Sequence, residues 1–333
     1  MMDYDMFKAV VEQEFKKFLP EEYQKMKMKI EPVKKVNCTL DGIRLVGIDG
    51  NKNVFPTIYI NDMYKHYSEC DDYREAIKEG AMEMAYLLDS FSEVEKIGID
   101  FTDAKENIVF QLVNTEQNRE MLQGMPHREM EDLSIIYRWV INTKWEGIQS
   151  SMVNNNLAEK LGLNEEQLYN LAVENTRRIF PPCIESMDDI IRKMFSNEGM
   201  QEDMIEMIVQ DKQSEKGMWV ITNDTKLFGA TTILYEDKLH ELAEQLGSNL
   251  YILPSSIHEV IAISAEIGSP DELAVMVEDV NMTEVSIEER LSNQVYHYDK
   301  DLRKLSLATN TPNKSLDGVV SEPAAIYETK QSR

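Results

Sequence analysis

The stretch from Gly217 to Ala265 constrains the fold most, because strand-like and helix-like segments alternate there more clearly than anywhere else in the chain. Short apolar runs rich in β-branched residues predict strands, and apolar residues at helical spacing predict a helix. The predicted elements are a strand at Met218–Thr222, a helix at Thr231–Leu246 ended by Gly247, a strand at Leu250–Leu253 and a strand through Val260–Ile263. We therefore expect a β-α-β-β unit within residues 217–265.

The whole chain has 333 residues, enough to bury a substantial core. The mixture of short strands and helices predicts an α+β fold with mixed, mostly antiparallel sheets and packed helices, in two lobes. We assign residues 1–97 to an N-terminal α-β-β-β-α lobe, 98–308 to a larger α+β lobe and 309–333 to an extended tail. The larger lobe is divided into a β-rich part at 107–153, helices at 157–210, the β-α-β-β unit at 217–265 and a hairpin at 291–308.

The β-β-α pattern recurs. Tyr59-Ile60-Asn61-Asp62 precedes one helical region, and Met152-Val153-Asn154-Asn155 precedes another. This similarity suggests that repeated β-β-α units arose by duplication.

The charge is strongly acidic, with 35 Lys and Arg against 60 Asp and Glu and a net charge of −25. Residues 184–290 hold 7 basic and 23 acidic side chains. Such a surface repels phosphate backbones, so the charge argues against nucleic-acid binding. Solubility explains the acidic charge most simply, and the alternatives are mimicry of a nucleic acid and docking on a basic partner.

The cysteines, the apolar runs and the N-terminal residues indicate the cellular compartment. Cys38, Cys70 and Cys183 are odd in number, widely spaced and typical of reduced thiols. The apolar runs are too short to span a bilayer, and the acidic start is unlike a secretory signal. No Gly-rich phosphate-binding motif occurs. We expect a cytoplasmic protein that has no membrane segment and no cofactor.

The turn at residues 254–259 is the best candidate for a catalytic site. Ser255, Ser256, His258 and Glu259 bring a hydroxyl, an imidazole and a carboxylate to the junction of two strands. A capped turn is the simpler interpretation, because Ser256 and His258 are too close in sequence for the usual nucleophile–base geometry. A hydrolase-like site remains the alternative.

The predicted helix at 231–246 offers a metal site. His240 forms i, i+4 pairs with Glu236 and Glu244, which could converge on one ion. The pattern differs from His-Glu-x-x-His, because Glu244 stands in place of the second histidine. His240 and Glu244 lie away from the apolar stripe, so a solvated helix face is the alternative interpretation.

Residues 157–178 have the spacing of a helix-turn-helix. Two capping boxes, Asn156 with Glu159 and Asn164 with Gln167, flank Gly162. The second helix opens with Glu165 and Glu166, which would face DNA phosphates. A structural helix pair is therefore favoured over DNA binding.

Methionines mark residues 187–210, which we interpret as two amphipathic helices separated near Gly199. Met194 and Met204 fall on the apolar faces, where methionine commonly fills a core. The alternative is an adaptable surface for a protein partner.

Several stretches together resemble a known family. They are Pro56–Tyr64, Asn107–Leu112, Leu133–Trp139, Tyr251–Glu259 and Leu291–Tyr296. On these the chain resembles an uncharacterised bacterial cytoplasmic family known only as a domain of unknown function. The resemblance implies a bacterial, soluble α+β protein, and it implies no activity, cofactor or catalytic residue.

These observations favour a non-enzymatic interaction or regulatory protein with a protein partner or a homo-oligomeric state. The alternatives are a hydrolase-like or metal-assisted enzyme with a site near Ser255–Glu259, and DNA binding through 157–178.

Overall fold

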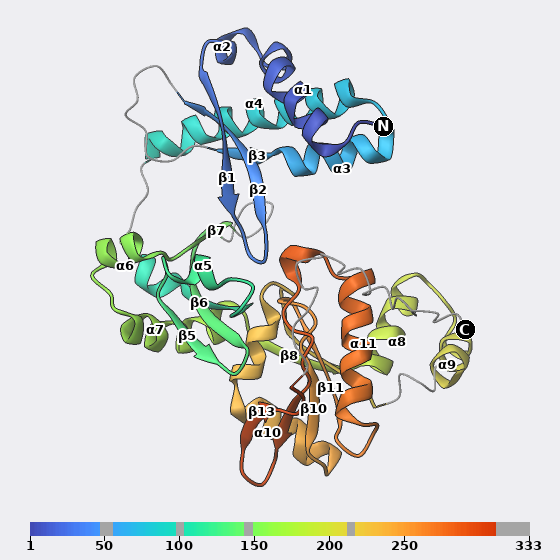
Figure 1. Cartoon of the computed structure of the whole chain (residues 1–333). Helices are drawn as coiled ribbons and strands as arrows, with labels where there is room; N and C mark the ends of the chain where they lie inside the picture. The colour runs from blue at the N-terminus through green and yellow to red at the C-terminus, as the bar shows by residue number, and fades with distance from the viewer. Residues whose placement is uncertain (47–55, 98–102, 143–148, 212–216, 311–333) are drawn as a thin grey trace, which may run out of the picture. The chain divides into compact units, whose positions relative to one another are not determined.

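The computed structural model describes residues 1–46, 56–97, 103–142, 149–211 and 217–310. The chain forms two compact units, Met1–Thr102 and Asp103–Arg333, both shown in Figure 1. The sequence placed the boundary between residues 97 and 98. The predicted tail at 309–333 lies outside the described residues from position 311 onward.

The first unit contains helices and one antiparallel sheet. Its elements are α1 (Tyr4–Phe18), α2 (Glu21–Gln24), β1 (Lys27–Lys34), β2 (Thr39–Val46), β3 (Thr57–Tyr59), α3 (Ile60–Cys70) and α4 (Tyr73–Ile97). The strand order is β1-β2-β3. The α-β-β-β-α order agrees with the sequence prediction.

A single face of α1 closes the core of this unit. Phe7, Val11 and Phe15 recur at helical spacing and are completely buried. They pack with residues of the sheet and of α3 and α4, among them Ile43 and Ile77. Because the apolar stripe of α1 is so regular, the sequence alone predicts its buried face.

The second unit is larger. Up to α9 its elements are η1 (Ala104–Asn107), β4 (Ile108–Asn114), α5 (Arg119–Leu122), β5 (His127–Met130), β6 (Leu133–Asn142), β7 (Gln149–Met152), α6 (Asn155–Leu161), α7 (Glu165–Ile179), β8 (Pro182–Ser186), α8 (Met187–Asn197) and α9 (Glu202–Asp211). They are followed by β9 (Trp219–Asn223), η3 (Gly229–Leu234), α10 (Glu236–Leu246), β10 (Leu250–Leu253), β11 (Val260–Ser264), α11 (Pro270–Thr283), η4 (Ile287–Glu289), β12 (Tyr296–Asp299) and β13 (Lys304–Leu307).

These strands form two sheets. One has the order β4-β6-β5, with β7 also paired to β6, and the other has the order β13-β12-β10-β11-β9-β8. All pairings between described strands are antiparallel. The fold is therefore α+β, as predicted. In the first unit β2 lies between β1 and β3, and among the three strands predicted for the second unit β6 pairs with both β4 and β7. The suggested duplication stays a prediction.

The six-stranded sheet is covered on both faces. Leu250 and Ile252 point to the large core that also holds Leu239 of α10, while Leu253 and Ile263 pack against α11. Alternation along β10 sends successive side chains to opposite faces, which explains why this short strand is apolar almost throughout.

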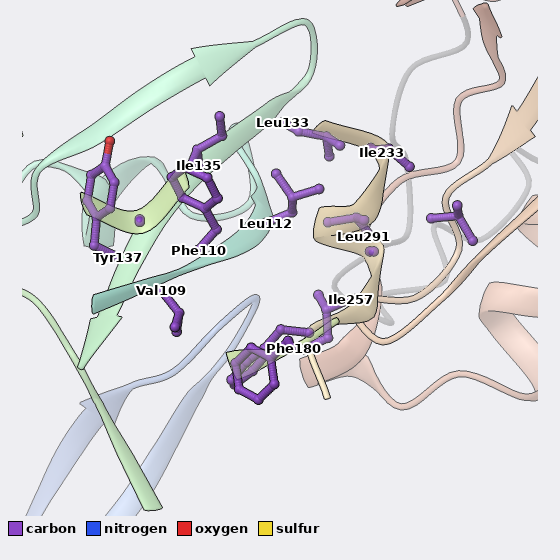
Figure 2. Close-up of a cluster of buried hydrophobic side chains, with 14 of the residues drawn as sticks. Val109, Phe110, Leu112, Leu133, Ile135, Tyr137, Phe180, Ile233, Ile257 and Leu291 are labelled. Carbon is purple, nitrogen blue, oxygen red and sulfur yellow. The ribbon is translucent and has the colours of Figure 1, made fainter. Parts of the chain in front are cut away.

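The large core joins the two sheets of the second unit. Figure 2 shows Phe110, Leu112 and Ile135 of the smaller sheet together with Ile257 and Leu291 from segments beside the larger one. Each fully buried side chain of this size contributes roughly 1.5–3 kcal/mol to folding. This core therefore holds together segments that are far apart in the sequence.

The β-α-β-β prediction is confirmed, with one correction. The segment predicted as one helix at 231–246 is a 3₁₀ helix, η3, followed by α10, which begins at Glu236. The hydroxyls of Thr231 and Thr232 donate to Phe228 O and Thr222 O, both at 2.8 Å. The Thr231 side chain bonds to backbone three residues earlier, which competes with the α-helix, and the Thr232 side chain is bonded to β9 instead. The regular helix starts only after Tyr235.

The hairpin predicted at 291–308 is shorter, because β12 begins at Tyr296 and residues 291–295 form no strand. The sequence also predicts neither β5 nor β8. β8 lies at the edge of its sheet and opens with Pro182, a residue tolerated only at such positions, so its sequence resembles a helix terminator.

Candidate functional site

The turn between β10 and β11 contains the predicted catalytic residues. The Ser256 hydroxyl oxygen accepts a hydrogen bond from the backbone N–H of His258 at 3.0 Å. Ser255 O accepts from Leu291 N at 2.9 Å. Glu259 is exposed. The two serines are thus engaged in the backbone geometry of the turn.

Both nitrogens of the His258 ring have neighbours. Nδ1 accepts a hydrogen bond from Phe228 N at 3.3 Å, and Nε2 lies 3.3 Å from Oε1 of Glu289. Since Nδ1 acts as an acceptor, the neutral ring carries its proton on Nε2 and directs it to the carboxylate. The lone pair that a general base would use is therefore already bonded to the protein backbone.

Two further contacts fix this turn to the sheet. Thr222 Oγ1 donates to His258 O at 2.8 Å, and the Phe228 ring stacks on the imidazole with centroids 6.2 Å apart. A Cβ on Gly229 would lie 2.2 Å from Thr222 Oγ1 and 2.3 Å from His258 O. Only glycine fits this close approach. No sequence spacing points to Phe228 or Glu289 as neighbours of His258, because both come from other segments.

The predicted metal ligands lie on α10. Glu236 accepts from Tyr298 OH at 2.7 Å and from Nε of Arg303 at 2.6 Å. The Arg303 hydrogen bond, followed by that of Tyr298, lowers the pKa of Glu236. Glu244 forms an ion pair with Lys300 at 3.3 Å.

His240 lies between these two acids in the sequence and is half-buried. Its Nδ1 atom is buried without a hydrogen-bond partner. In the part of the chain that the structure describes, no group of three or more His, Cys, Asp or Glu side chains is arranged to hold a metal ion. The two glutamates instead bind basic side chains and a hydroxyl of the β12–β13 hairpin region.

The predicted helix pair is present as α6 and α7. Gly162 ends α6 with a φ of 66°, and Asn164 with Gln167 forms the predicted capping box. The predicted box of Asn156 with Glu159 is wrong. Asn154 caps α6 by accepting from Leu157 N, because the helix begins earlier, at Asn155.

The second helix of this pair packs on the smaller sheet. Thr176 Oγ1 accepts from Phe110 N of β4 at 3.0 Å, and Leu168 and Ala172 are completely buried. Ion pairs join both ends of α7 to other elements. Glu165 at its start pairs with Arg128, and Arg177 near its end pairs with Asp237. These contacts fit a structural role for the helix pair.

The Met-rich helices α8 and α9 lie next to one another (Figure 1). Ile191, Ile205 and Val209 are buried between them. Met194 and Met204, placed by the sequence on the apolar faces, are each 49% exposed, and Met207 is 65% exposed. The two-helix packing is narrow and covers only the centre of each apolar stripe, so methionines at the margins remain in contact with solvent.

The fold is that of an α+β protein with separate antiparallel sheets, and no group of His, Cys, Asp and Glu side chains among the described residues is arranged as a metal centre. The chain belongs to the family of unknown function DUF5688, whose sequence model matches residues 4–300. No curated protein and no solved structure matches the chain. No helix in the described ranges is long and apolar enough to cross a membrane.

Proposed function

We propose that this protein is a non-enzymatic, cytoplasmic interaction protein of bacteria that binds a basic amphipathic helix of a protein partner through α8 and α9. The observation that carries the proposal is the exposure of Met194, Met204 and Met207 on two helices with an acidic surface. Methionine is flexible and polarizable, which suits it to contact apolar side chains of varied shape.

Charge complementarity defines the partner. Residues 185–211 contain eight acidic and two basic side chains. Both basic ones are already paired, Lys193 with Glu185 and Arg192 with Glu206. The surface therefore presents an excess of carboxylates around apolar side chains. A helix with one apolar and one basic face is complementary to it.

The state of the three cysteines supports a cytoplasmic location. Cys38, Cys70 and Cys183 form no disulfide. Cysteines in this state are typical of proteins kept in a reducing environment, such as a cytoplasm.

The test uses the full chain and two labelled peptides of the same composition. One peptide has leucine and lysine at helical spacing, so that it has one apolar and one basic face. The second is a scramble without that spacing. Fluorescence anisotropy should show binding of the first peptide and at least about tenfold weaker binding of the second, since only the first presents a continuous apolar face.

Variants locate the binding surface. Met204→Glu with Met207→Glu should weaken binding of the amphipathic peptide at least about tenfold, because it places charge in the apolar contact. Met82→Glu is the matched control, since Met82 is 59% exposed but lies on α4 of the other unit. Equal binding by the scramble, or equal loss in the Met82 variant, would contradict the proposal.

The enzymatic alternative has one observation in its favour, the pairing of the His258 imidazole with the Glu289 carboxylate at 3.3 Å. Elemental analysis and mass spectrometry of the purified native protein test it. A stoichiometric metal or small molecule would support a site at His258 or His240, and a stoichiometric protein would support the interaction role.

A further inference from the structure

In the part of the chain that the structure describes, the sheet of the first unit ends in a long strand, β1, that pairs with a neighbour on one side only. β1 pairs with β2 along all eight of its residues, from Lys27 opposite Val46 to Lys34 opposite Thr39. In the strand order β1-β2-β3, β1 lies at the edge. An edge strand presents a row of backbone N–H and C=O groups to any further strand.

Register and hydrogen bonds identify which amides face outward. Lys35 N donates to Cys38 O at 2.9 Å, so the residues in alternate positions before it also bond toward β2. The intervening positions, which include Met28 and Ile30, direct their N–H and C=O groups away from β2. Pro32, which has no N–H, occupies one of these outward positions, as the pattern requires.

The same alternation gives the strand two different faces. Met28 and Ile30 are half-buried and lie opposite Leu45 and Ile43, which belong to the core. Lys27 and Lys29 are exposed on the other face. A strand added at this edge would therefore extend the apolar core with one set of side chains. With the other set it would meet Lys27 and Lys29, the second of which lies 3.8 Å from the Glu31 carboxylate on the same face.

This region is basic in an otherwise acidic protein. Residues 25–46 contain six Lys and Arg against two Asp and Glu, whereas the whole chain has a net charge of −25. Lysine at a strand edge also discourages pairing with a second copy of the same edge, since like charges would meet. The charge thus disfavours self-association here and favours an acidic partner.

We propose that the β1 edge binds an extended segment of another protein in which apolar and acidic residues alternate, by adding it as a fourth strand to this sheet. Backbone hydrogen bonds to Met28 and Ile30 supply the attachment. Apolar side chains of the segment pack beside Met28 and Ile30, and its carboxylates face Lys27 and Lys29. This inference is independent of the surface on α8 and α9.

The experiment measures binding of a labelled peptide of alternating glutamate and valine to the full chain by fluorescence anisotropy. A peptide of alternating lysine and valine is the charge control, and an N-methylated copy of the first peptide is the backbone control. We expect binding of the first peptide alone. Absence of binding, or equal binding of either control, would overturn the inference.

Hydrogen exchange then identifies the bound edge. The amides of Met28 and Ile30 should exchange at least about tenfold more slowly when the acidic peptide is bound, because hydrogen bonding protects them. Protection confined to other segments would place the peptide elsewhere and reject the β1 edge.

Charge reversal completes the test. Lys27→Glu with Lys29→Glu should weaken binding roughly tenfold, since two favourable cross-strand pairs become repulsive. Lys65→Glu with Lys78→Glu makes the same change in net charge at exposed positions on α3 and α4 and should leave binding within about twofold. An equal loss in both variants would indicate attraction to overall charge and contradict a β1 site. Circular dichroism of each variant confirms that the chain is folded.

Discussion

Oγ of Ser292 donates a hydrogen bond to Oδ2 of Asp132 at 2.6 Å, across 160 positions of the sequence. The other carboxylate oxygen of Asp132 accepts from the hydroxyl of Tyr296. Asp132 lies in the turn between β5 and β6, whereas Ser292 lies just before β12 and Tyr296 is the first residue of β12. One carboxylate therefore joins the smaller sheet to the larger sheet of the second unit.

Loss of this carboxylate should destabilise the second unit. Asp132→Ala leaves two buried hydroxyls without their acceptor, and we expect about 2–4 kcal/mol less free energy of unfolding in urea titrations. Burial, followed by the nearby Asp132 carboxylate, raises the pKa of Tyr296 well above its ordinary value, so the hydroxyl stays protonated as a donor.

Tyr298→Phe is the control for Asp132→Ala, because its hydroxyl also bonds a carboxylate, that of exposed Glu236. We expect it to cost less than about 1 kcal/mol, since water can replace an exposed partner. Similar losses in the two variants would show that Asp132 has no special part in joining the sheets.

Gly229→Ala should be strongly destabilising. The added methyl group would lie 2.2 Å from Thr222 Oγ1 and 2.3 Å from His258 O, so backbone and side chain must both move. We expect a loss of about 1–3 kcal/mol or more in the free energy of unfolding. Gly124→Ala is the matched control, because the nearest atom to its added methyl is Met121 O at an ordinary 3.6 Å. A neutral result at position 229 would refute the close approach.

Acid should weaken the ion pair that fixes the start of α7. Burial alone would raise the pKa of Glu165, but hydrogen bonds from Arg128 and Tyr137 outweigh burial and lower it. A carboxyl whose folded pKa is lowered stabilises the protein above its unfolded pKa, which is about 4.3, and this contribution is lost as the pH falls through the folded pKa.

We therefore expect the urea midpoint of the native chain to fall more between pH about 5 and about 3 than that of Glu165→Gln, which lacks the titrating group. Glu166→Gln is the neighbouring control, since Glu166 is exposed. It should retain the native acid dependence. If the urea midpoints of Glu165→Gln and the native chain fall equally with acid, the ion pair of Glu165 with Arg128 makes no contribution to stability.

His258→Ala distinguishes a structural from a catalytic histidine. The ring accepts the Phe228 N–H and stacks on the Phe228 side chain, so its removal should lower the free energy of unfolding by about 1–3 kcal/mol. The measurement is thermal and urea denaturation beside ligand analysis of the purified protein. An unchanged melting temperature together with loss of a bound ligand would instead support the hydrolase-like alternative.

Local patterns determined much of this fold. The stripe of Phe7, Val11 and Phe15 predicts the buried face of α1, and the short apolar runs predict β9, β10 and β11. These features depend on periodicity, because a helix or strand places residues of fixed spacing on one face. The capping box of Asn164 with Gln167 is equally local, since three residues separate its partners.

The tertiary structure decided which residues the polar candidate site residues contact. His258 meets Phe228 and Glu289, and Glu236 meets Tyr298 and Arg303, all from segments that no sequence spacing connects to them. The long-range pairing of Asp132 with Ser292 has the same origin. Propensity and periodicity specify an element and its buried face, whereas contacts between elements depend on how the sheets and helices pack around the shared core. The sequence by itself therefore determined the fold class and many elements, and packing decided the surroundings of each candidate site residue.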